Sequence, residues 1–484
     1  MRNGAEILKL GTLTLVWWCI IFGAVWAACY IVGILIPMML SSYESDAARM
    51  TAETCRALTP ILSVLVFIPI NAMFMVLFER RGLAIFTVRL GPNRVGPDGY
   101  LQTAADAVKL LFKEDITPRG ADAFMFTLAP IVFFAPSIFG AMPLLAAVTN
   151  YHELFQIVNL PTGIFFILAA SSVPVVGIVM GGWASNNKYS LVGGLRSAAQ
   201  AISYEIPLVL SLVTVCLMAG TLDVVQIAKQ QAGGILNWNI FGGGALRGLD
   251  SALALKFSNQ PPALQELSQK SFDQVLKSSY VEPTMQAIGL GAGQEGLAGI
   301  IAALAVVILI GSILIAYGLY MTGACAEINR IPFDLPEAES ELVSGYNTEY
   351  SGIKFAIFFL AEFTNLFIVA SIAAVMFLGG GDCPVPAWLG TMLGGPVMES
   401  MINQALTPLI QIKLVDPPTL FAAIWVILKV YSIVFFAVLI RGTLPRFRID
   451  QLMDFGWKRL IPLSLIVFVL VVFAREFVNV HVGS

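Results

Sequence analysis

Four ionisable residues stand within, or at the end of, long apolar segments of the sequence. They are Glu205, Glu327, Glu362 and Lys429. An unpaired charge in such a segment costs several kcal/mol, so each acid must be paired, neutral or hydrated. Three such acids in one chain indicate a shared path along which protons are gained and lost. A structural ion pair, for example between Glu205 and Arg196, is the alternative interpretation.

A second group of acids follows Glu327 directly. The segment 326–341 reads AEINRIPFDLPEAESE and contains one base, Arg330. Its further acids are Asp334, Glu337, Glu339 and Glu341. Clustered carboxylates raise one another's pKa values, which suits them to hold and release protons near neutral pH. A solvated acidic loop is the alternative.

A basic turn and an amphipathic helix occupy residues 79–112. The turn begins with Glu79 and Arg80 and continues through RLGPNRVGP, which holds two Gly-Pro steps, one preceded by Arg89 and the other by Arg94. From Tyr100 to Phe112, apolar residues lie on one helical face and polar residues, including Asp106, on the other. This pattern predicts a helix at the membrane interface. Charge anchoring alone would also explain the arginines, and it is the favoured explanation for the segment 441–452 taken alone.

The elements that must position these residues are membrane helices. The chain has 484 residues, of which 57% are hydrophobic and 12% charged, and its mean hydropathy is +0.81. Soluble domains contain about 25% charged residues, so a soluble globule and a disordered chain are both excluded. A net charge of −3 excludes a nucleic-acid-binding protein, which needs a basic surface.

A membrane-spanning helix needs roughly 20 apolar residues. Nine segments qualify, at about 12–38, 57–78, 121–147, 161–182, 201–219, 297–319, 354–378, 419–440 and 459–474. The sequence therefore predicts an all-α integral membrane protein, forming a single membrane domain over 1–484, with about nine transmembrane helices plus interfacial amphipathic helices.

Lysine and arginine set the orientation of these spans. One side holds seventeen of these bases and the other nine, or four once the long segment 222–296 is discounted. The richer side is predicted to be cytoplasmic. Its loops are 79–120, 183–200, 320–353 and 441–458.

The sequence offers no ligands for a redox centre. The six cysteines stand singly and there are two histidines, whereas iron–sulfur clusters, haem and zinc sites need grouped Cys or His ligands. We expect no metal, no cofactor and no catalytic redox ligand in this chain. If the protein takes part in redox chemistry, the electrons must come from a partner.

Taken together, four segments resemble one family, the H-type membrane subunit of NADH-quinone oxidoreductase (respiratory complex I), which corresponds to NADH dehydrogenase subunit 1 of mitochondria. The segments are GPNRVGPDGYLQTAADAVKLLFKE, GWASNNKYSLVGGLRSAAQAISYE, AEINRIPFDLPEAESELVSGYNTEYSG and LPRFRIDQLM. Together, and in this order, they are very specific. The resemblance covers well over half of the chain.

The resemblance implies a multi-pass subunit of the bacterial inner (plasma) membrane that forms a chamber for the quinone substrate and couples quinone reduction to proton translocation. Electrons would come from FMN and iron–sulfur clusters in partner subunits. Partners would be the peripheral-arm subunits carrying the terminal cluster, small and antiporter-like membrane subunits, and lipid. The chamber residues would be Glu79, Arg80, Arg89, Arg94, Asp106, Asp334, Glu337, Glu339 and Glu341. The proton path would hold Glu205, Glu327 and Glu362, to which we add Lys429 from its position within a span.

Two segments depart from the family pattern, because 222–296 and 379–418 are longer than expected and lie on the outer side. The first could fold alone or bind an accessory subunit. The alternative function is the matching membrane subunit of a membrane-bound hydrogenase. A stand-alone ion transporter is disfavoured, since the chain shows no internal repeat.

Overall fold

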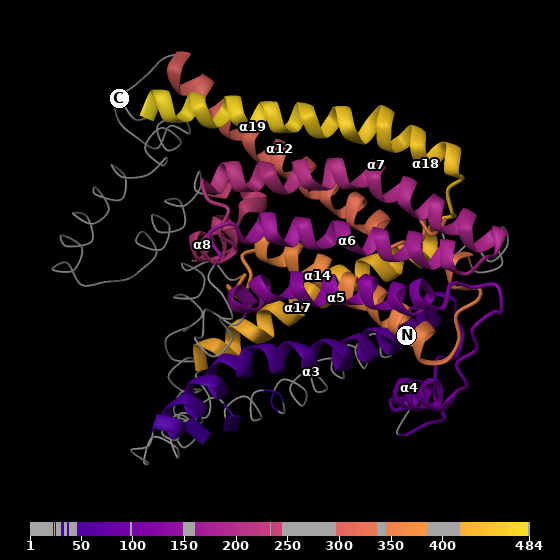
Figure 1. Cartoon of the computed structure of the whole chain (residues 1–484). Coiled ribbons are helices and arrows are strands. Elements are labelled where there is room, and N and C mark those ends of the chain that lie inside the picture. The colour runs from indigo at the N-terminus through magenta and orange to yellow at the C-terminus, as the bar shows by residue number, and fades with distance from the viewer. Residues whose placement is uncertain are drawn as a thin grey trace.

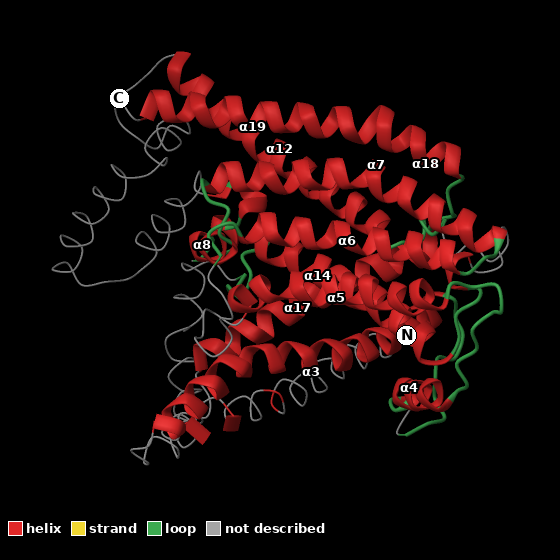
Figure 2. Ribbon diagram, viewed as in Figure 1, coloured by secondary structure: helices red, strands yellow, loops and turns green. Residues whose placement is uncertain are grey.

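The computed structural model describes seven stretches of the chain, together with isolated positions between residues 23 and 37. The stretches are 46–96, 99–148, 160–232, 234–243, 297–335, 345–384 and 417–482. Within them the chain forms helices joined by turns, without strands (Figure 2). Eight of the described helices are long and apolar enough to cross a membrane. The predicted fold class, an all-α membrane protein, is confirmed.

Eight of the nine predicted spans correspond to these helices. They are α3 (Asp46–Phe86), α5 (Ala123–Val148), α6 (Gly163–Ala184), α7 (Lys188–Ala219), α12 (Leu297–Glu327), α14 (Gly352–Phe377), α17 (Pro417–Thr443) and α19 (Ile461–Val482), the last preceded by α18 (Ile449–Phe455) and one π-helical turn (Gly456–Leu460). The predicted span 12–38 lies outside the described residues except for isolated positions. Apolar runs of this length form helices because a backbone in lipid must satisfy its own hydrogen bonds.

The long helices pack side by side as a bundle whose two ends differ (Figure 1). One end carries the amphipathic helix α4 (Gln102–Phe112), helix α18 and the turns that follow α3, α6 and α12. We call it the basic end, because the described parts of the four loops of the base-rich side meet there. The opposite end carries the short helix α8 (Val224–Gln230), and we call it the far end.

Some helices extend beyond the predicted spans at the basic end. Helix α7 begins at Lys188 rather than near 201, and the Asn187 side chain caps it by accepting a hydrogen bond from the Tyr189 amide. The polar residues of its first turns do not form a solvated loop. Ser190, for example, is buried and donates to the Tyr346 carbonyl at 3.1 Å. Because such polar residues bond to neighbouring segments of the same chain and not to water, the helix extends toward its N-terminus beyond the apolar span.

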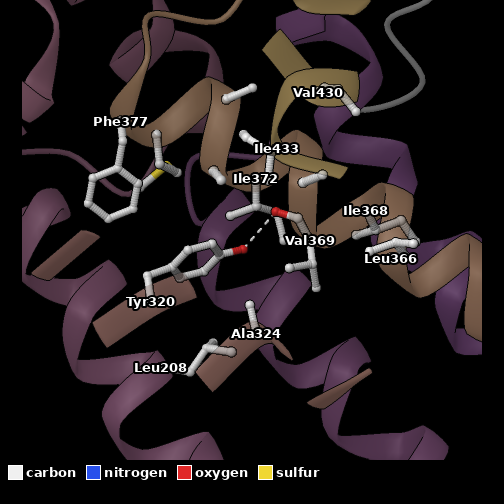
Figure 3. Close-up of a cluster of buried hydrophobic side chains, with 14 of the residues drawn as sticks. Leu208, Tyr320, Ala324, Leu366, Ile368, Val369, Ile372, Phe377, Val430 and Ile433 are labelled. Atoms are coloured by element: carbon white, nitrogen blue, oxygen red, sulfur yellow. Dashed lines mark hydrogen bonds between the residues drawn. The ribbon is translucent and has the colours of Figure 1, made fainter. Parts of the chain in front are cut away.

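The core of the bundle is a continuous apolar cluster with few polar contacts. In it the fully buried Tyr320 of α12 directs its hydroxyl at the Val369 carbonyl of α14, at 2.9 Å, between Leu208 and Ile372 (Figure 3). A buried tyrosine hydroxyl needs such a partner. This bond fixes the relative positions of α12 and α14, the two helices that carry Glu327 and Glu362.

Helices α5 and α6 approach each other closely at one glycine. A Cβ added to Gly177 would lie 2.7 Å from the Phe133 backbone nitrogen, so no larger residue fits without separating the helices. Small residues allow this contact in membrane bundles. The approach sets the position of α6, which contributes two serines to the site.

Candidate functional site

Glu79 lies near the basic end of α3 with 5% of its surface exposed. The Arg330 Nη1 donates to both of its carboxylate oxygens, at 2.9 and 2.8 Å. Arg441, in the last turn of α17, forms an ion pair with the same carboxylate. Two arginines facing one glutamate leave one positive charge in excess, so these three residues, the arginine–glutamate cluster, attract negative charge.

Arg330 also contacts α14, the helix that carries Glu362. Its guanidinium carbon lies 4.3 Å from the centre of the Phe363 ring, a cation–π contact. Phe363 is the next residue after Glu362, and Arg330 itself lies three residues after Glu327. The structure therefore joins the cluster to α14 one residue from Glu362, while Arg330 follows the end of α12 by three residues.

The other described charged residues of the predicted chamber are more exposed than Glu79. Arg80 pairs with Asp106 of α4 at 2.7 Å, with 44% and 28% of the two side chains exposed. Arg89 and Arg94 are exposed on the turn. Asp334 pairs with Arg446 at 2.8 Å. These contacts tie α3 to α4, and the loop after α12 to the loop after α17.

Three predicted chamber residues cannot be placed. Glu337, Glu339 and Glu341 lie outside the described residues.

Helix α4 is confirmed close to its predicted bounds, and its apolar face has no cover within the described chain. Val108, Leu111 and Phe112 are 51%, 62% and 87% exposed. Such a face is typical of a helix lying in a membrane interface or against a partner.

Glu205 of α7 and Glu327 at the end of α12 lie close enough for their charges to interact. Two adjacent serines of α6 lie beside the two carboxylates. The Ser172 hydroxyl donates to the Glu205 Oε1, and Ser171 lies within hydrogen-bonding reach of Glu327. Arg196 is nine residues from Glu205 on the same helix, or roughly 13 Å along its axis, so Ser172 is the closer partner.

A small cavity of about 30 Å³ lies between helices α5, α6, α7, α12 and α14. Its polar lining includes Ser171, Glu327 and Asn365. A cavity holds a water when it offers at least about 10–15 Å³ and polar partners, so this one has room for one or two. Pro136 and Pro174 also border it, and each lacks the backbone N–H that a helix would use there.

Glu362 of α14 is buried, with 6% of its surface exposed. It accepts a hydrogen bond at 2.8 Å from the hydroxyl of Tyr346, which lies in the short turn η7 (Gly345–Asn347). Asn365, at the cavity, is three residues further along the same helix. The cavity therefore borders Glu327 and lies within one helical turn of Glu362 along α14.

Lys429 is located differently from the three acids. Its Nζ donates to the carbonyls of Leu378, Gly380 and Asp382, at 2.6, 2.9 and 2.7 Å. Leu378 is sixteen residues beyond Glu362, or roughly 24 Å along a helix axis. The structure therefore places Lys429 at the far end and away from the acids.

Sequence reasoning missed four residues of this site, namely Ser171, Ser172, Tyr346 and Arg441. The two serines, adjacent in an apolar run, were a visible signal. Arg441 was explained as a charge anchor, although it pairs with a buried glutamate. The partner of Tyr346 depends on packing between distant segments, and no local pattern indicates it.

Among the residues that the structure describes, no group of three His, Cys, Asp or Glu side chains could hold a metal ion. The polar side chains of the site carry carboxylates, guanidinium groups, hydroxyls and the Asn365 amide. The carboxylates can exchange protons, and the other groups bind and orient them.

A family model described as NADH dehydrogenase matches residues 59–261 and 280–472. The match includes α3 from Thr59 onward, all the described helices from α4 to α17, and every described residue of the site. It also continues through the described part of the segment that was expected to be an insertion, 222–296. On this evidence the chain belongs to the NADH dehydrogenase family and is a multi-pass membrane subunit of a complex I-type oxidoreductase.

Proposed function

We propose that this chain is the H-type membrane component of a bacterial inner-membrane NADH:quinone oxidoreductase, and that it forms the membrane side of the quinone chamber. It couples quinone reduction to proton translocation through Glu205, Glu327 and Glu362. The observation that carries the proposal is the position of Arg330, which binds buried Glu79 and also rests on Phe363, beside Glu362.

The chemistry of quinone reduction suits this arrangement. A quinone takes up two electrons and two protons to become a quinol, so negative charge develops on its oxygens before the protons arrive. The excess positive charge of the arginine–glutamate cluster would stabilise that charge. A change of charge at the cluster also alters the electrostatic field at Glu362 and Glu327, and this changes their affinity for protons.

The other parts of the enzyme would come from partners. FMN and iron–sulfur clusters in the peripheral arm deliver the electrons, and antiporter-like subunits carry protons onward. Helix α4, with its exposed apolar face, would lie where the chamber meets lipid. Glu337, Glu339 and Glu341 would belong to the acidic loop between the chamber and the membrane.

Single Gln variants of Glu205, Glu327 and Glu362 in the complete complex test the function. Gln keeps the size and most of the hydrogen bonding of Glu, but its amide cannot gain or lose a proton as a carboxyl group does. We expect assembled complexes in which quinone-dependent NADH oxidation falls by at least about tenfold, with weaker proton translocation in the remaining activity. Ferricyanide reduction, which takes electrons before the chamber, should stay near normal.

Glu53→Gln is the matched control, because Glu53 is an exposed acid of α3. It should leave both activities unchanged. Wild-type quinone reduction with full proton translocation in all three buried-acid variants would contradict the proposal.

A further inference from the structure

Two adjacent serines of α6 each contact an acid from a different helix. Ser172 bonds to Glu205 of α7, and Ser171 lies within hydrogen-bonding reach of Glu327 of α12. Consecutive residues of a helix point about 100° apart, so one helix can serve both neighbours. Ser171 and Glu327 also line the cavity, whereas Ser172 is not among its lining residues.

Each of these hydroxyls has a second acceptor on its own helix. Ser171 Oγ lies 3.0 Å and Ser172 Oγ 3.1 Å from the same Leu168 carbonyl oxygen. A serine hydroxyl carries one proton and two lone pairs. It can therefore donate either to the Leu168 carbonyl or to its carboxylate, but not fully to both at once.

The protonation state of the acid decides between these two arrangements. An ionised carboxylate is the stronger acceptor, so the hydroxyl then donates to it. A protonated carboxyl group instead donates its own proton to the serine oxygen, and the hydroxyl turns to the Leu168 carbonyl. Hydrogen bonding is satisfied in both states by rotation of one O–H bond, with no heavy atom displaced.

The two acids also influence each other. Their charges lie close enough to interact, so a change of charge on one acid acts on the other. The cluster bases are engaged elsewhere, since Arg330 and Arg441 bind Glu79. The serines are thus the hydrogen-bond donors placed to compensate a charge on either acid.

We propose that Ser171 and Ser172 are positioning residues of the proton path, which keep Glu327 and Glu205 hydrogen-bonded in both protonation states and so hold the two states close in free energy. This inference rests on the proposed function, because it assigns a role within that path. The cavity beside Ser171, Glu327 and Asn365 supplies the space for water to bring a proton to the pair.

Alanine and threonine variants in the complete complex test the inference. Ser171→Ala with Ser172→Ala removes both donors to the charged forms, while threonine keeps a hydroxyl at each position. A hydrogen bond to a charged group changes an equilibrium constant on the order of 10- to 100-fold. We therefore expect the double alanine variant to favour the protonated acids and to translocate fewer protons per electron. The double threonine variant should restore most of the lost proton translocation.

Two measurements separate this role from a purely structural one. Protons translocated per electron are measured in proteoliposomes, and the carboxylic acid carbonyl band is followed by infrared difference spectroscopy on reduction. The intensity of this carbonyl band should increase in the double alanine variant and return to the wild-type intensity in the double threonine variant. Ser211→Ala is the control, because Ser211 of α7 is a buried serine whose hydroxyl donates to its own helix at Leu208, at 2.6 Å. It should change neither measurement.

The outcomes distinguish this inference from the proposed function. Normal proton stoichiometry and an unchanged carbonyl band in the double alanine variant, with impaired Glu205→Gln and Glu327→Gln variants, would overturn the serine role alone. Normal Gln variants would overturn both. If the double alanine variant does not assemble, as judged by lost ferricyanide activity, the two single alanine variants carry the test with the same criteria.

Discussion

At the residue scale, burial separates ion pairs that look alike in the sequence. Glu79 and Asp106 both pair with arginine, yet Glu79 is buried between two of them and Asp106 is 28% exposed at its side chain. A buried pair is costly to break, because removal of one partner leaves an uncompensated charge away from water. An exposed pair contributes about 0–1 kcal/mol.

The first prediction follows from this contrast. Glu79→Gln leaves Arg330 and Arg441 facing each other without a carboxylate, and we expect it to destabilise the basic end by about 3–5 kcal/mol. The measurements are the amount of assembled complex and its thermal inactivation temperature, both of which should fall. Asp106→Asn, the matched control at the exposed pair, should leave both nearly unchanged. Equal effects of the two variants would contradict the assignment of Glu79 as the buried centre.

At the element scale, the end of α14 shows how side chains complete a buried helix terminus. The last carbonyls of a helix have no partner within it. The Gln231 side chain donates to the Val375 carbonyl at 2.8 Å, and the Asn239 side chain donates to that of Met376 at 2.7 Å. These residues follow α8 and belong to segment 222–243, so the described part of the expected insertion is built into the bundle.

Lys429 completes the same terminus from α17. Its ammonium group lies 4.1 Å from the centre of the Trp238 ring, and that ring packs on Gly379. Gly379 has φ +72°, and an added Cβ would lie 2.4 Å from the indole nitrogen, so only glycine fits there. The contacts of Lys429 favour a structural role, whereas its predicted place in the proton path stays untested.

The second prediction concerns this lysine. Lys429→Met leaves three carbonyls without their charged donor, at about 1–3 kcal/mol for each buried group left unpaired. We expect less assembled complex and a lower inactivation temperature, but normal protons per electron in what assembles. Lys229→Met, at an exposed position of α8, should have little effect. A stable Lys429→Met complex with a reduced proton ratio would place the lysine in the proton path instead.

At the scale of the whole molecule, the two ends of the bundle differ in chemistry. The arginine–glutamate cluster, α4 and the loops after α6 and α12 meet at the basic end, and the loops there are fastened to one another. Lys354 pairs with Asp115 at 3.0 Å, and Asn187 donates to Glu349 at 2.7 Å. Such cross-links hold the described loops of this end in fixed positions relative to one another.

The third prediction is the orientation of the bundle. In a background with the six native cysteines replaced by alanine, Asn93→Cys at the basic end should be protected from a membrane-impermeant thiol reagent in intact cells. It should react in inverted vesicles. Ala232→Cys, exposed at the far end, should show the opposite pattern. Labelling of Asn93→Cys in intact cells would reverse the topology that the distribution of lysine and arginine predicts.

The sequence by itself determined the helical architecture and the location of the acids along it. Apolar segments of about 20 residues leave the backbone no alternative to helix in lipid, and an acid within such a segment is visible in the sequence. The helical period likewise predicted α4 before its position was known. These features are local, because they depend on residues within a few turns of one another.

Only the tertiary structure decided which residues pair. Arg330 and Glu79 are 251 residues apart, and Lys429 binds carbonyls about 50 residues away rather than an acid. Ser171 and Ser172 gain their significance from helices α12 and α7, which supply the two acids they contact. Such pairs depend on which helix neighbours which, and this is settled by side-chain packing and close approaches such as that at Gly177, not by any local pattern.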